Sequence, residues 1–101
     1  MSFMHVANIN EIPDGRSKVF SVNGRAIAVF NLKGRYHAIL DACPYKGDAL
    51  TEGDLDETLI SCPCHGFQFD VVSGICASDP MSRATTYEVK LEGDKVLLKT
   101  E

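Results

Sequence analysis

The sequence predicts an all-β protein of antiparallel strands. Short runs rich in β-branched and aromatic residues alternate along the chain with Gly, Asn and Asp turn signals. The 101 residues are 45% hydrophobic, enough for one packed core and too few for two independent ones. We therefore expect a single domain spanning residues 1–101.

Asn23-Gly24 is the strongest turn signal, because both residues readily adopt the positive φ that a two-residue hairpin requires. It predicts a hairpin between strands 18–22 and 25–30. A third strand, 36–40, is expected after Lys33-Gly34, and strands 84–91 and 95–99 are expected to pair across residues 92–94.

From about residue 41 to residue 80 the pattern changes to short apolar pieces broken by Cys-Pro and Gly. We interpret this segment as a loop-rich subdomain inserted into the β scaffold. The expected architecture is therefore an antiparallel sandwich or barrel carrying one inserted subdomain.

The formal net charge is −4, with acidic and basic residues mixed along most of the chain, so neither nucleic acid nor an anionic membrane is an expected partner. No apolar run approaches the roughly 18 residues that a membrane span needs, and the first ten residues do not resemble an export signal. We expect a cytoplasmic protein. In that compartment four cysteines favour metal ligation or free thiols over disulfides.

Two short loops carry the chemistry, and each contains Cys-Pro followed by Gly. The first holds Cys43 and Tyr45, and the second holds Cys62, Cys64 and His65. Two turns that each project a thiolate, with a histidine three residues after the second cysteine, can close on one metal centre from opposite sides. The spacing is that of metal ligands.

These loops resemble the Rieske family, whose pattern is Cys-x-His, about 15 to 17 residues, then Cys-x-x-His around a [2Fe–2S] cluster. Sixteen residues separate Tyr45 from Cys62, and the resemblance continues through Ser73-Gly74 to Asp79-Pro80, which is similar to the family's proline loop. It implies that Cys43 and Cys62 bind the inner iron and His65 the outer iron.

Tyr45 occupies the position of the family's other histidine. A phenol must lose a proton to bind metal, and neutral imidazole need not, but tyrosinate is an iron ligand in other proteins. Tyr45 is therefore the tentative fourth ligand, and a water or an open position is the alternative. Cys64 is interpreted as a free thiol or, less favourably, as a ligand, since Asp48 stands where the disulfide partner of respiratory Rieske proteins would be.

Three further residues have structural interpretations. His37 is expected on a strand surface and Cys76 in the core. Phe69 is expected to be a hydrophobic wall beside the cluster.

The resemblance implies a soluble Rieske-type ferredoxin: a one-electron carrier, with no catalysis of its own, between a flavin reductase and a terminal oxygenase or similar enzyme. One alternative is a cluster-free Rieske-like module resembling the small subunit of NADH-dependent nitrite reductase. Another is a single iron or zinc bound by Cys43, Cys62, His65 and either Tyr45 or Cys64. The sequence leaves the redox partners, the pathway and the oligomeric state open.

Overall fold

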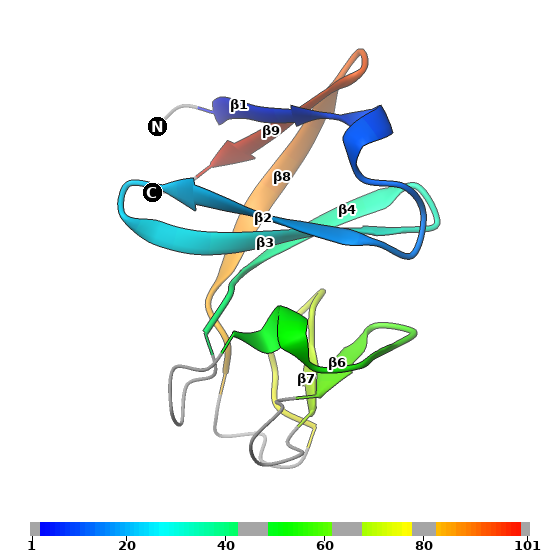
Figure 1. Ribbon diagram of the computed structural model, residues 1–101, viewed down its shortest axis with the longest axis vertical. Coiled ribbons are helices and arrows are strands. Elements are labelled where there is room, and N and C mark those ends of the chain that lie inside the picture. The colour runs from blue at the N-terminus through cyan, green and yellow to red at the C-terminus, as the bar shows by residue number, and fades with distance from the viewer. Residues whose placement is uncertain (1–2, 43–48, 62–67, 78–82, 100–101) are drawn as a thin grey trace.

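The computed structural model describes residues 3–42, 49–61, 68–77 and 83–99 of the chain, without the side chain of residue 52. These residues form a six-stranded antiparallel sheet, a three-stranded antiparallel sheet and two short 3-10 helices. The larger sheet curls into a nearly closed barrel, and the smaller one lies beneath it in Figure 1. The all-β antiparallel prediction is confirmed. Within the described ranges, no helix has the length and apolar character of a membrane span.

The barrel sheet has the strand order β1-β9-β8-β4-β3-β2. A 3-10 turn, η1 (Ile9–Glu11), follows its first strand. The strands of the barrel sheet are β1 (Phe3–Asn8), β2 (Ser17–Val22), β3 (Arg25–Leu32), β4 (Arg35–Leu40), β8 (Thr86–Glu92) and β9 (Lys95–Lys99).

Two of the barrel's hairpin turns have the positive φ angles that two-residue loops need. Asn23 and Gly24 have φ of 52° and 78°, which confirms the predicted hairpin between β2 and β3. Lys33 and Gly34, with φ of 56° and 85°, connect β3 to β4 in the same way. A lysine is unusual in this conformation, and its backbone N–H donates a 2.6 Å hydrogen bond to Asp14 Oδ1. A contact from distant sequence thus stabilises the turn.

The segment predicted to be loop-rich contains a small sheet of order β5-β6-β7. Its strands are β5 (Leu55–Asp56), β6 (Leu59–Ser61) and β7 (Gln68–Asp70), and the 3-10 turn η2 (Leu50–Glu52) precedes them. Strands of two or three residues are too short to show an alternating pattern, so sequence periodicity did not indicate them.

Strand β3 is buried on both faces. Ile27 and Val29 point into the barrel, whereas Ala28 and Phe30 point toward the small sheet. All four are at most 1% exposed, which explains why this strand is a continuous apolar run instead of an alternating one. The side chains of β3 that point into the barrel belong to a cluster of buried residues that we call the barrel core. Its buried members are Ala7, Ile12, Val22, Ile27, Val29, Ala38, Val96 and Leu98.

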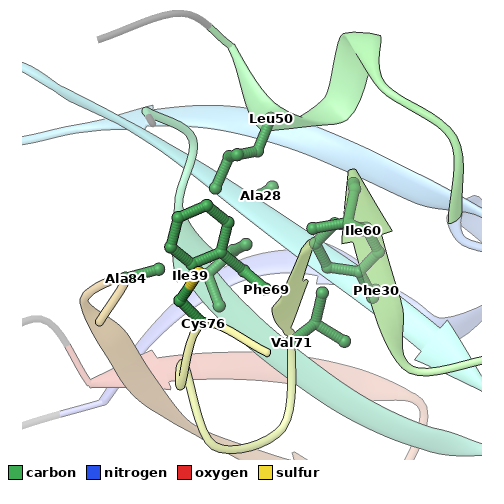
Figure 2. Close-up of a cluster of buried hydrophobic side chains, with 9 residues drawn as sticks. All are labelled: Ala28, Phe30, Ile39, Leu50, Ile60, Phe69, Val71, Cys76 and Ala84. Carbon is green, nitrogen blue, oxygen red and sulfur yellow. The ribbon is translucent and has the colours of Figure 1, made fainter. Parts of the chain in front are cut away.

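The second cluster, which we call the interface core, joins the barrel to the small sheet. Figure 2 shows Phe69 of β7 near Ile39 of β4, Cys76 and Ala84, with Phe30 beside Ile60. The cluster consists of Ala28, Phe30, Ile39, Leu50, Ile60, Phe69, Val71, Cys76 and Ala84. Burial of this set attaches the small sheet to the barrel at a fixed position.

Gly53 lies where the backbone after η2 approaches β6. Its φ of −87° and ψ of 178° are available to any residue, so conformational freedom does not explain the glycine. A Cβ at this position would overlap the carbonyl oxygen of Ser61 and lie 2.8 Å from its carbonyl carbon. Close packing of two backbones therefore requires glycine here.

We predict that Gly53→Ala destabilises the protein by about 3 kcal/mol or more, because the overlapping atoms are backbone and cannot rotate away. The matched control is Gly34→Ala, which has positive φ but nothing within 4 Å of the added Cβ and should cost about 1 kcal/mol. Urea unfolding of both variants gives the comparison. Equal losses would contradict the close approach of Gly53 to Ser61.

Candidate metal centre

All the sequence-predicted ligands fall outside the described residues. Cys43 and Tyr45 belong to segment 43–48, and Cys62, Cys64 and His65 belong to segment 62–67. The structure instead describes the residues that flank these two segments and the neighbouring segment 78–82. Contacts among these flanking residues hold the two sides of each segment together.

The first segment is closed by a side chain. Asp41 directly follows β4 and is 7% exposed. Its Oδ1 accepts a 2.8 Å hydrogen bond from the Thr51 backbone N–H, and its Oδ2 accepts a 2.9 Å bond from Thr51 Oγ1. We call this pair the Asp41–Thr51 clamp. It joins the residues on the two sides of segment 43–48.

The second segment is closed by backbone pairing. Ser61, the last residue of β6, lies opposite Gln68, the first residue of β7, in the antiparallel ladder. Segment 62–67 thus starts and ends at paired positions. The Gln68 carbonyl also accepts a 2.7 Å hydrogen bond from the N–H of Ala77, the last described residue before segment 78–82.

The third segment is also closed by backbone contacts. Ile75 and Arg83 form an isolated antiparallel bridge, and the Ala84 N–H donates to the Gly74 carbonyl at 2.7 Å. Two residues after the bridge, the Thr85 carbonyl accepts a 2.8 Å bond from the Leu40 N–H. Leu40 adjoins Asp41, so this contact leads back to the first segment.

The flanks of the three segments therefore contact one another in a closed cycle. The Asp41–Thr51 clamp is followed in the chain by Gly53, whose backbone lies against the Ser61 carbonyl. Ser61 pairs with Gln68, whose carbonyl accepts the hydrogen bond from Ala77. The bridge at residue 83 and the bond from Leu40 complete the cycle. The described residues on either side of these segments, although far apart in sequence, thus form one connected frame.

An apolar floor lies beside this frame. Phe69 and Cys76 are paired in a β-bridge, and neither side chain is exposed to solvent. The placement of Cys76 in the core is confirmed, and it is a free cysteine. Phe69, expected as a hydrophobic wall, is part of the interface core, so solvent is excluded from this side of the frame.

The two described histidines serve local roles. His37 remains in β4 opposite Phe30, where it lines a groove of about 430 Å³ with Val71 and Glu88 among its neighbours. Burial lowers the pKa of its imidazole below the ordinary value, and Asp70 opposes this shift. The His5 ring Nε2 lies 3.1 Å from Asn8 Oδ1.

Among the described residues, no group of three or more His, Cys, Asp or Glu side chains could hold a metal ion. The sequence interpretation missed the roles of Asp41 and Thr51. A signal was present, because Asp41 interrupts a run of apolar residues just before Cys-Pro, and aspartate often closes loops by bonding to backbone N–H groups.

A family model described as the Rieske [2Fe-2S] domain matches residues 2–98. One curated relative is the ferredoxin component of the naphthalene 1,2-dioxygenase/salicylate 5-hydroxylase systems of Ralstonia sp. It is 32% identical over 101 residues, covering 99% of this chain and 97% of the relative.

Solved structures share the fold. The ferredoxin of carbazole 1,9a-dioxygenase from Nocardioides aromaticivorans IC177 covers the full length of both chains with a TM-score of 0.90 at 24% identity. A chain in the complex of reduced oxygenase and oxidized ferredoxin in carbazole 1,9a-dioxygenase has a TM-score of 0.87 at 28% identity, covering 98% of this chain and 97% of that one. From the match over residues 2–98 and the full-length relative, we conclude that this chain belongs to the Rieske [2Fe-2S] domain family.

Proposed function

We propose that this protein is a Rieske-type ferredoxin that binds a [2Fe–2S] cluster and carries one electron at a time to a terminal oxygenase. The main observation in support of this proposal is the near full-length similarity to the ferredoxin component of a dioxygenase system. The frame described above supports it, because the flanks of both ligand segments are joined in a single cycle of contacts.

The donor set fits an iron–sulfur cluster. We assign Cys43 and Cys62 to the inner iron and His65 to the outer iron, with Tyr45 as the tentative fourth ligand. Two thiolates and an imidazole are the ligand types that hold Rieske clusters. When bound, the cluster supplies one-electron chemistry at near-constant geometry. The described residues supply the frame, which holds the flanks of both loops, and the apolar floor formed by Phe69 and Cys76.

Two partners follow from this role. The oxygenase partner is supported by the similarity to a ferredoxin chain solved in complex with its oxygenase. The electron donor is proposed to be a flavin reductase, and the cytoplasm is the proposed compartment, in keeping with a free cysteine in the core.

The direct test is purification without oxygen, followed by measurement of iron, acid-labile sulfide and the visible spectrum. We expect two irons and two sulfides per chain, bleaching by one electron, and reoxidation on mixing with a terminal dioxygenase. Cys43→Ser, which replaces an assigned ligand, is the control and should lose the sulfide. A stoichiometric metal without sulfide would instead support a mononuclear site. Absence of both would support a cluster-free module.

Tyr45 is the proposed weak point of the site. We predict that Tyr45→His slows loss of the cluster in air by about tenfold, because imidazole binds iron without first losing a proton. The rate is followed by the decay of visible absorbance. Tyr45→Phe is the matched control, since it removes only the phenol oxygen and tests whether that oxygen binds iron. If all three proteins decay equally, the fourth position does not limit cluster stability.

The reduction potential should lie at or below the low end of the Rieske range, about −150 mV. By resemblance, high-potential members have hydroxyl donors where this chain has Phe67 and Phe69, and Phe69 is buried in the interface core without a hydroxyl. A tyrosinate at Tyr45 would lower the potential further through its negative charge. Protein-film voltammetry from neutral to alkaline pH measures both the potential and its slope. A value above 0 mV, or two ligand ionisations, would contradict this assignment.

A further inference from the structure

We propose that the Asp41–Thr51 clamp is a positioning element that determines how firmly the cluster is retained, although neither residue binds it. This inference rests on the proposed function, because it concerns the loop that carries Cys43 and Tyr45. Asp41 lies two residues before Cys43 and Thr51 lies six residues after Tyr45.

The first argument is an asymmetry among the three segments. Segments 62–67 and 78–82 are both closed by backbone contacts, the Ser61–Gln68 pair and the bridge between residues 75 and 83. Within the described residues, the hydrogen bonds that join residues 40–42 to residues 49–53 are the two of the clamp. Closure of the first ligand segment therefore depends on a side chain.

The second argument is the chemistry of the clamp. Asp41 is 7% exposed, and the carboxylate of a buried residue must receive hydrogen bonds from the protein. Thr51 supplies one bond to each oxygen, at 2.8 Å and 2.9 Å, which fixes the distance and the orientation of the carboxylate. Leu50, buried in the interface core, also holds this part of the chain, but apolar packing is not directional.

The backbone of Asp41 is itself fixed to the barrel, because its N–H donates a 2.9 Å bond to the Ala26 carbonyl. The clamp thus connects the returning end of the ligand segment to the rigid hairpin of β2 and β3. Metal sites tolerate ligand displacements of only about 0.2 Å, and loss of supporting contacts typically costs 10-fold to 100-fold in metal affinity. A substitution at Thr51 that breaks the clamp should therefore weaken retention of the cluster.

The experiment compares Thr51→Val with Thr51→Ser in the full chain. Valine keeps the shape of threonine and removes the bond to Asp41 Oδ2, whereas serine keeps the hydroxyl. Cluster loss to a chelator is followed by visible absorbance, and the reduced cluster is examined by electron paramagnetic resonance. We expect Thr51→Val to lose the cluster about tenfold faster with a broadened or shifted spectrum, and Thr51→Ser to stay within twofold of the parent.

Asp41→Asn is the conservative variant at the other partner. Its carbonyl can still accept from the Thr51 N–H, and its amide can donate to Thr51 Oγ1, so it should retain the cluster. Asp41→Ala, which removes both acceptor oxygens, should lose the cluster faster than the parent. In the metal-free protein, the Thr51 amide should exchange slowly with deuterium in the parent and in Asp41→Asn and rapidly in Asp41→Ala, a readout that needs no cluster.

Ile60→Val separates positioning from general stability, because it trims the same interface core without touching the clamp. Its metal-free form and that of Thr51→Val are compared by urea unfolding. If both variants lose the cluster at rates that depend only on their stability, the clamp has no positioning role and the proposal is overturned. If the parent contains the cluster and Thr51→Val loses it no faster than the parent, the proposal is also overturned. The proposed electron-carrier function would stand in that case. A parent that lacks iron and sulfide overturns both.

Discussion

Burial of β3 on both faces is the constraint on which the rest of the structure depends. One row of its side chains, including Ile27 and Val29, fills the barrel, and the other row, with Ala28 and Phe30, packs against the small sheet. The part of a strand that is buried on both faces is expected to be apolar, as residues 27–30 are here. The barrel and the small sheet are therefore not independent units joined by a linker, because both cores pack against side chains of β3, and a change in its register would exchange the two rows.

Packing on β3 also positions residues that flank the proposed ligand segments. The small sheet contributes Phe69 to the interface core, and its β6–β7 pair also closes the second ligand segment at Ser61 and Gln68. Packing at one end of these strands thus fixes the geometry at the other. The cycle of contacts around the three segments then distributes this rigidity to residues that are distant in sequence, which suits a carrier whose cofactor should change charge without a large change in shape.

In the proposed site, Tyr45 stands at the position where the Rieske pattern has its first histidine. In the proposed site a phenol replaces a neutral imidazole, so binding would require loss of a proton and add a negative charge. The described residues include a glycine at residue 53 that a close backbone approach requires and a buried Asp41 that accepts a hydrogen bond from Thr51. In this proposal, the chemistry of Tyr45 decides how firmly the frame retains a cluster.

The sequence by itself determined the features that depend on neighbouring residues: the Asn23-Gly24 hairpin, through its positive φ, and the spacing of the Cys-Pro loops that identified the family. It also predicted Cys76 in the core. Only the tertiary structure revealed the three-stranded small sheet, the need for glycine at residue 53 and the Asp41–Thr51 clamp. The physical reason is that strands of two or three residues carry no period, and that a backbone overlap or a side-chain bond depends on segments the fold brings together.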